Sequence, residues 1–266
     1  MAAAPSPPSG SATAGPRTRT SVRTAVVWDH LRAALGGLAG GTLDVLDAGG
    51  GSGGFAVPLA QLGHRLTVVD PSPDSLAALE RRAAETGTTG SIRAVQGDAA
   101  GLAEVLPGAS FDAVVCHSVL EVVDDPVEAL AAITAVLRPG GVVSVLAANR
   151  TAAVLARVSA GRLAEARRLL GDPAGVSGEG DPLLRRFALD ELQQLLANAG
   201  LHVRAVHAIR VFADLAPPPL LDGDPDAAAD LLALERAASE RADYIPVATQ
   251  FHLVASRGNR DVSDRG

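Results

Sequence analysis

Residues 43–60, LDVLDAGGGSGGFAVPLA, place five glycines and two acids directly after a short apolar run. Glycine has no Cβ, so a glycine-rich turn lets the backbone approach a ligand closely. Two spacings overlap here: G-x-G-x-x-G ends at Gly54, and D-x-G-x-G-x-G begins at Asp47. The first suits a pyrophosphate at a helix N-terminus, whereas in the second Asp47 could meet an ammonium group of the ligand. We expect the ligand to contact Gly49, Gly50, Gly51 and Gly53.

Two further acids follow strand-like segments downstream. Asp70 ends HRLTVVD, where a carboxylate can accept hydrogen bonds from both ribose hydroxyls. Asp70 therefore indicates a ribose-bearing ligand without choosing between a nicotinamide dinucleotide and S-adenosylmethionine. Asp98 ends SIRAVQGD, where an acid can accept from the adenine amine and the N–H of Ala99 can meet a ring nitrogen. That position favours S-adenosylmethionine.

Strand-like and helix-like segments alternate around these residues. Apolar runs of this kind are typical of strands covered on both faces, and the alternation predicts a doubly wound α/β fold with a mostly parallel sheet. Ser72 with Pro73, and Asp125 with Pro126, predict two helix starts, and Pro-Gly-Gly a helix end. Further helices are expected at 55–62 and 226–241, and strands at 43–46, 64–70, 91–98, 111–118, 142–148, 201–212 and 247–256.

Five pieces in this order, DAGGGSG, VVD, GDAA, FDAVV and LRPGG, resemble the class I S-adenosylmethionine-dependent methyltransferases. The resemblance covers about residues 43–148. It implies S-adenosyl-L-methionine as the cofactor and a seven-stranded, Rossmann-like sheet whose last strand is antiparallel. The segment 150–187 is then an insertion after the fifth strand, lying as a cap over the active site, since open α/β sheets bind ligands at the carboxyl ends of their strands.

A narrower set of segments is similar to the bacterial tRNA 5-carboxymethoxyuridine methyltransferases. VRTAVVWDHL resembles that family's arginine-bearing helix and implies a donor contact for Arg23. CHSVLEVVDDP implies a position for His117 near the methyl donor, and AIRVFADL (208–215) and residues 231–257 extend the likeness over most of 17–257. The acceptor implied is the carboxylate of a modified tRNA wobble uridine.

The insertion departs from this family, because the lysine-rich run of its best-known members is missing. Arginines can still neutralise RNA phosphates, since each pairs bidentately with a phosphate. They are interleaved with acids here and could equally form a solvated helix face. The arginines in question are Arg162, Arg167, Arg168, Arg185 and Arg186.

A carboxylate acceptor is already ionised near neutral pH and needs cationic groups to orient it rather than a base. Our candidates for this role are Arg210, Arg150 and Arg23. His117 could act as a base for a hydroxyl or amine acceptor, but packing and positioning against the donor is favoured. Two alternatives stay open: a small-metabolite methyltransferase of the same fold, and a non-catalytic S-adenosylmethionine-binding protein.

Composition and charge limit the classes of protein to which this sequence can belong. The net charge of −7 gives no support to a strongly basic nucleic-acid binder. Cys116 is the only cysteine, which excludes an intramolecular disulfide and a cysteine metal cluster, and no metal site is expected. No run is apolar enough to cross a membrane, so a cytoplasmic protein is expected. Residues 1–16 and 258–266 are predicted to be disordered tails around one domain at 17–257.

Overall fold

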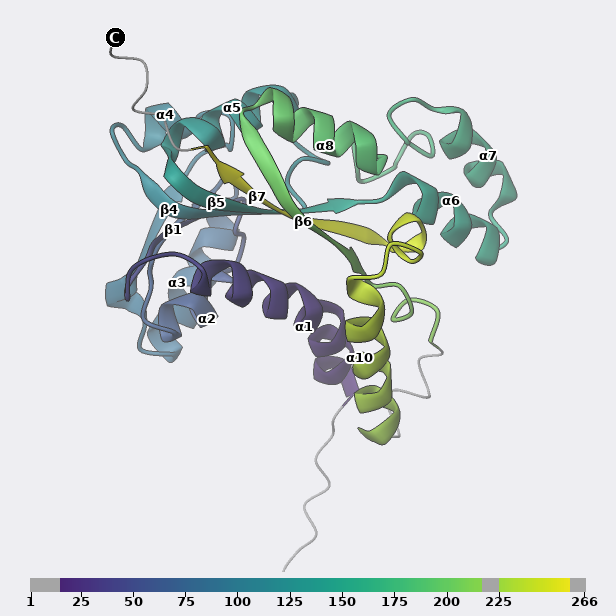
Figure 1. Ribbon diagram of the computed structural model, residues 1–266, viewed down its shortest axis with the longest axis horizontal. Coiled ribbons are helices and arrows are strands. Elements are labelled where there is room, and N and C mark those ends of the chain that lie inside the picture. Colours follow the sequence, from purple (N-terminus) through teal and green to yellow (C-terminus); the bar gives the residue numbers. More distant parts are fainter. Residues whose placement is uncertain (1–14, 217–224, 259–266) are drawn as a thin grey trace, which may run out of the picture.

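Seven strands form a single sheet in the order β3-β2-β1-β4-β5-β7-β6 (Figure 1). The computed structural model describes residues 15–216 and 225–258. Neighbouring strands from β3 to β5 are parallel, whereas β7 runs antiparallel between β5 and β6. The predicted seven-stranded, mostly parallel sheet with an antiparallel last strand is therefore confirmed. The strands are β1 (Asp44–Ala48), β2 (Arg65–Asp70), β3 (Ile92–Gln96), β4 (Phe111–His117), β5 (Leu137–Ala148), β6 (Leu201–Ile209) and β7 (Gln250–Arg257).

Helices cover both faces of the sheet (Figure 1). On one face α1, α2 and α3 pack on the strands, with Leu31, Leu59 and Leu79 in one buried cluster. On the other face α4, α5 and α8 enclose a second cluster that includes Leu130 and Leu192. These helices are α1 (Gly15–Gly36), α2 (Ala56–Gln61), α3 (Pro73–Glu85), α4 (Leu102–Val105), α5 (Pro126–Val136) and α8 (Leu189–Asn198).

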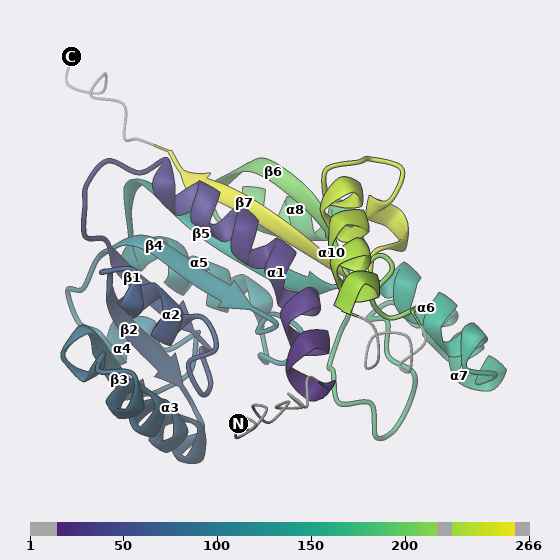
Figure 2. The ribbon, with the colours of Figure 1, turned by 90° about the horizontal axis from the view of Figure 1, so that it is seen from below.

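The remaining helices gather near one end of the sheet (Figure 2). α6 (Arg150–Ser159) begins directly after β5 and is followed by α7 (Leu163–Gly171), so both belong to the segment read as an insertion. α10 (Pro225–Ser239) packs on α1, where Leu231 and Val22 are buried together. None of the helices described in 15–216 and 225–258 is long and apolar enough to cross a membrane.

Local signals placed most elements correctly. Ser72 Oγ accepts from Ser75 N at the start of α3, and Asp125 caps α5 by accepting from Val127 N, each with proline at the first helical position. Several boundaries differ; β7, for example, begins at Gln250 and not at 247. α1 begins at Gly15, inside the predicted tail, because Pro16 is compatible with a first helical turn. β5 begins at Leu137, where it pairs with Phe111. β6 ends at Ile209, because Arg210 adopts a left-handed conformation (φ 60°).

Candidate functional site

The glycine turn after β1 is shaped by conformations that side chains avoid. Gly49, Gly51 and Gly53 all have positive φ, at 74°, 53° and 79°. A Cβ at Gly49 would also collide with the side chain of Val119, and one at Gly53 with that of Leu79. Both backbone conformation and space therefore require glycine at these two positions.

Gly50 and Gly54 form a matched pair for mutation. A Cβ at Gly50 would lie 2.5 Å from Asp47 Oδ2 and 2.8 Å from Val68 Cγ1, whereas nothing lies within 4 Å of one at Gly54. We expect Gly50→Ala to lower the free energy of unfolding by at least about 1 kcal/mol through overpacking. Gly54→Ala should be neutral. Urea denaturation of both variants checks this, and equal midpoints would contradict the assigned crowding at Gly50.

Asp47 lies at the end of β1 with its side chain buried (3% exposed). Its Oδ2 has no hydrogen-bond partner within the described part of the chain. Burial raises the pKa of this carboxyl to about 7, and the negative charge of Asp70 adds to the rise. A buried, unpartnered carboxylate oxygen beside a glycine turn is a ready acceptor for a cationic group of a ligand.

Because its pKa is raised, Asp47 destabilises the ligand-free protein, and this destabilisation increases with pH. An unfolded chain ionises this group near pH 4, whereas the folded chain holds the proton up to about pH 7. The folded state therefore loses stability, relative to the unfolded state, as pH rises through this window. We expect Asp47→Asn to stabilise the free protein more at pH 8 than at pH 5. Urea midpoints at both pH values test this, and a pH-independent difference would refute it.

The side chain of Asp70 connects the turn after β1 with the turn after β2. Its Oδ2 accepts from Gly51 N at 2.9 Å, and its Oδ1 accepts from Ser72 N at 2.9 Å. The side chain is buried, yet each oxygen keeps a lone pair for a further donor. Asp70 thus joins the glycine turn to the start of α3 and can accept two hydroxyl groups beside it.

The turn after β3 lies next to Asp70. Gly97 N donates to Asp70 O at 3.2 Å, Asp98 is exposed, and Ala99 is buried. Asp98 Oδ1 accepts from Ala100 N at 2.9 Å, which closes a short Asx turn. The residues predicted to contact adenine therefore lie at the same edge of the sheet as Asp70, the predicted ribose acceptor.

His117 ends β4, the strand beside β1. Its ring packs edge-on against Phe55, with centroids 4.5 Å apart, and Phe55 stacks on Trp28. His117 Nε2 lies 2.7 Å from Ser144 Oγ, whereas its Nδ1 is buried with no hydrogen-bond partner in residues 15–216 and 225–258. Burial lowers the pKa of the ring to about 3, so the imidazole is neutral at pH 7.

A cavity of about 820 Å³ opens beside the carboxyl ends of β4 and β5. Its volume falls in the range of small-molecule pockets. Apolar side chains from α6, from 211–215 and from 244–247 form much of its wall. Its polar and charged lining includes Ser118, Glu121, Asn149, Arg157, Arg186, Arg210, Asp214, Thr249 and Gln250.

Glu121, for which the sequence favours a structural role, lines the cavity. Its side chain is 1% exposed, and Oε1 accepts from Ala148 N at 2.8 Å. Oε2 has no hydrogen-bond partner among the residues described, and burial raises the pKa of the carboxyl to about 7. In the sequence Glu121 follows His117 by four residues, but this spacing alone does not place it in a cavity. The fold brings it to the cavity wall.

The three arginines expected to orient an anion are separated in space. Arg210 lines the cavity, where its guanidinium pairs with Asp214 at 2.6 Å. Arg150 points elsewhere: it pairs with Glu191 and donates to Pro173 O. Arg23 lies on α1, but its side chain falls outside the described residues. Of these predictions, only that for Arg210 corresponds to a described place in the cavity.

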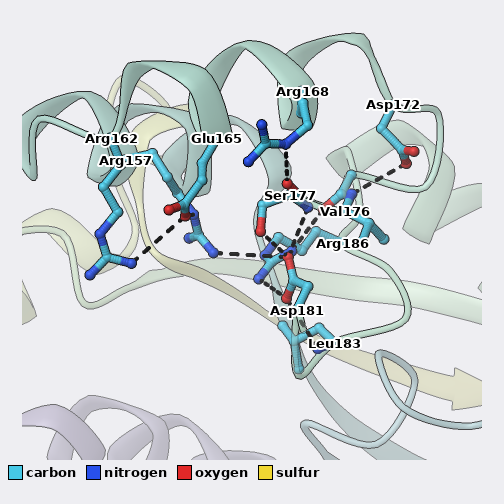
Figure 3. Close-up of polar contacts among 11 residues, drawn as sticks. Arg157, Arg162, Glu165, Arg168, Asp172, Val176, Ser177, Asp181, Leu183 and Arg186 are labelled. Atoms are coloured by element: carbon cyan, nitrogen blue, oxygen red, sulfur yellow. Dashed lines mark hydrogen bonds and ion pairs between the residues drawn. The ribbon is translucent and has the colours of Figure 1, made fainter. Parts of the chain in front are cut away.

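The arginines of 161–187 are mostly engaged within the segment itself (Figure 3). Arg186 is buried and holds Asp181 through both oxygens at 2.8 and 2.9 Å. Arg168 Nε donates to Ser177 O at 2.7 Å, and Arg162 lies 3.7 Å from Glu165. Arg185, outside this cluster, donates to backbone oxygens of 120, 123 and 124. Arg167 is exposed on α7.

Part of the chain, which includes the glycine turn, is similar to a known family. Residues 46–145 match the family model described as a methyltransferase domain. The tRNA 5-carboxymethoxyuridine methyltransferase of Escherichia coli (strain K12) is 32% identical over 144 residues, 54% of this chain and 55% of the relative. A ubiquinone biosynthesis O-methyltransferase of Xanthomonas euvesicatoria pv. vesicatoria is 33% identical over 162 residues, 61% of this chain and 64% of the relative.

The fold is similar to that of solved methyltransferases. The magnesium protoporphyrin IX methyltransferase of Synechocystis PCC 6803, solved with bound SAH, superposes with a TM-score of 0.56 at 16% identity. That match covers 90% of this chain and 83% of the other. The chain spans only about half to two thirds of the length of the two curated relatives. Both relatives transfer methyl groups, as their names state, but to different acceptors.

Proposed function

We propose that this chain, which has the fold and domain of the class I S-adenosylmethionine-dependent methyltransferases, transfers a methyl group from that donor to an acceptor held in the cavity beside α6. The observation that carries the proposal is the Oδ2 of Asp47 at the glycine turn, which is buried and has no hydrogen-bond partner among the described residues. S-adenosylmethionine supplies an electrophilic methyl group on a sulfonium sulfur, and it carries an ammonium group that an acid can pair with.

The protein's part in this reaction is to hold both partners in line. Asp47 would accept from the donor's ammonium group, and Asp70 from its ribose hydroxyls. The turn at Asp98 and Ala99 would meet the adenine. Since methyl transfer is an in-line displacement, positioning supplies most of the catalysis. Removal of the methyl group turns a cationic sulfonium into a neutral thioether, so the product carries one positive charge less.

The cavity supports a small-molecule acceptor. Its volume and its alanine, leucine and valine walls suit a compact, partly apolar molecule. The insertion offers little free positive charge for an RNA backbone, because Arg168, Arg185 and Arg186 are occupied by intramolecular hydrogen bonds. Similarity to ubiquinone biosynthesis O-methyltransferases also favours this acceptor class.

The second candidate acceptor is the carboxylate of 5-carboxymethoxyuridine at the tRNA wobble position. It is favoured by the 32% identity to the Escherichia coli enzyme and by Arg210 in the cavity wall. Arg210 already pairs with Asp214, so it would have to exchange that partner for the acceptor.

Three experiments test these proposals. Calorimetry with S-adenosylmethionine and with S-adenosylhomocysteine measures donor binding, and absence of binding to either would refute the methyltransferase assignment. Mass spectrometry of tRNA nucleosides from a deletion strain then separates the acceptors. An unchanged level of esterified wobble uridine would reject the tRNA acceptor. Methyl transfer into extract that has been freed of RNA would support the small molecule, and donor binding without turnover in any extract would indicate a non-catalytic binding protein.

A further inference from the structure

Three histidines and a serine form a continuous polar chain across the sheet. His117 of β4 and His252 of β7 each place Nε2 2.7 Å from Ser144 Oγ of β5. His252 Nδ1 lies 3.1 Å from His207 Nδ1 of β6. Because β4, β5, β7 and β6 are successive neighbours, this network crosses four strands of the sheet. The helix α1 packs on three of them, β5, β6 and β7 (Figure 2). All of these side chains except that of His117 are at least nine tenths buried.

At its end on β6, this network of side chains contacts a partly exposed histidine of α1. The ring of His207 stacks on that of His30 in α1, with centroids 3.5 Å apart. Ser239 Oγ donates to Arg236 O, so its lone pair accepts from His30 Nε2 at 3.1 Å. That leaves His30 Nδ1 as an acceptor. The carboxylate of exposed Glu240 and ring nitrogens of His30 and His207 lie within 4.8 Å of one another.

Only two continuous proton arrangements fit these contacts. In the outward arrangement, His117 Nε2–H donates to Ser144, Ser144 donates to His252 Nε2, and His252 Nδ1–H donates to His207 Nδ1. In the inward arrangement every one of these hydrogen bonds is reversed. Each neutral ring carries one proton, so a change at one ring forces a change at the next. The outward arrangement leaves His117 Nδ1 as a bare, basic nitrogen, and the inward one makes it an N–H.

We propose that His117 Nδ1 accepts the proton of a hydroxyl or amine acceptor, and that Ser144, His252 and His207 pass a proton on towards His30 and Glu240. This inference rests on the proposed function and names its substrate class: a group that loses a proton when it is methylated. His117 is the catalytic residue, and the other three are relay residues that act through it. The buried, unpartnered Nδ1 of His117 is the free end of the chain.

The step is balanced in atoms and charge. A lone pair of the acceptor oxygen attacks the methyl carbon, the O–C bond forms, the C–S bond breaks, and its electron pair stays on sulfur. The acceptor proton moves to His117 Nδ1, and one proton shifts along each hydrogen bond to His207, whose Nε2–H passes a proton out. The positive charge of the sulfonium thus leaves as a proton. An acceptor that is already a carboxylate would have no use for this relay.

Because these rings are buried, we expect their protons to move together and not one at a time. Burial lowers the pKa of His117 to about 3, that of His207 to about 4, and that of His252 well below its ordinary value. A lasting imidazolium inside the sheet is therefore disfavoured. Neutral rings that exchange tautomers together avoid that charge.

Nuclear magnetic resonance of the protein labelled with ¹⁵N-histidine tests the relay directly. The protein has six histidines. Two of them, His64 and His202, lie outside the relay and serve as internal controls. The ¹⁵N shifts report which nitrogen of each ring carries the proton. We expect His117, His252 and His207 to show the same fractional population of the outward arrangement. Unequal populations, or a fixed Nε2–H on both His117 and His252, would overturn the proposal.

Sinefungin, a donor analogue with an amine in place of the transferable methyl group, adds a second measurement. Its ammonium should donate to His117 Nδ1 and drive all three rings to the outward arrangement, leaving His64 unchanged. Ser144→Ala should abolish the response of His252 and His207, while His117 still responds to sinefungin. His252→Gln offers the same test if the first variant does not fold. A response of His117 alone in the wild-type protein would refute the relay, whereas failure of sinefungin to bind would contradict the proposed function instead.

Discussion

Replacing Arg186 by alanine is expected to lower the free energy of unfolding by about 3–5 kcal/mol, as is usual when one partner of a buried ion pair is removed. The side chains of Arg186 and Asp181 are 5% and 0% exposed, and they share two hydrogen bonds at 2.8 and 2.9 Å. Arg186 also donates to Gly175 O. The variant therefore leaves a buried carboxylate whose remaining cationic partner, Arg157, lies 3.9 Å away. The urea midpoint of the variant, compared with that of the wild-type protein, measures the loss.

Arg167→Ala is the matched control, because it removes the same charge from an exposed position on α7. A surface substitution of this kind should change stability by no more than about 0.5 kcal/mol. A loss in Arg167→Ala as large as that in Arg186→Ala would show that net charge, and not the buried pair, is responsible.

The Arg186 effect should also depend on pH. Burial raises the pKa of Asp181, but hydrogen bonds from Arg186 and Ser177 outweigh it and hold that pKa below its ordinary value. A carboxyl with a depressed pKa stabilises the folded state above about pH 4 and loses that contribution as pH falls. The gap between the wild-type protein and Arg186→Ala should therefore narrow in acid. A gap that stays constant down to pH 3 would contradict the ion pair as its source.

The ion pair also changes how the insertion is understood. From sequence, Arg185 and Arg186 were candidates for contacting RNA phosphates. In the fold Arg186 holds the segment 172–187 together through Asp181 (Figure 3). Arg185 attaches this segment to the loop after β4. A count of arginines could not separate these roles, because whether a guanidinium meets solvent or a carbonyl depends on contacts distant in sequence.

The positions of the residues proposed to bind the donor could be predicted because the elements that carry them are local in sequence. A strand, a glycine turn and a helix are consecutive, and each acid follows its own strand, so spacing alone placed Asp47 and Asp70 at the same edge of the sheet. Parallel strands bring their carboxyl ends together whatever the loops between them do.

The cavity and the histidine–serine network could not be predicted in the same way, because they are assembled across the sheet. Ser144 and His252 are 108 residues apart and meet only because β7 returns antiparallel beside β5. Glu121 reaches the cavity through a turn whose backbone oxygen accepts from Leu184 N. A histidine within an apolar strand such as QFHLVAS was the available signal for a buried polar network, since such a group needs a partner.

Asp70→Ala is expected to weaken binding of S-adenosylmethionine by about 1–3 kcal/mol, or roughly 5- to 150-fold in Kd, because it leaves buried donors unpaired. Two effects combine. The ribose hydroxyls lose their acceptor, and Gly51 N and Ser72 N lose the carboxylate that joins the glycine turn to α3. Calorimetric titration of the donor measures the change.

Asp74→Ala is the control for Asp70→Ala, since it removes an equal charge from an exposed position in the first turn of α3. It should leave donor affinity unchanged. The alternative to a ribose contact is that Asp70 only holds the turn. In that case adenosine, which keeps the ribose but lacks the amino-acid end, and methylthioadenosine would bind the wild-type protein no better than adenine does. A steep gain in affinity from adenine to adenosine that Asp70→Ala abolishes, with folding intact, is the result that assigns the ribose to this carboxylate.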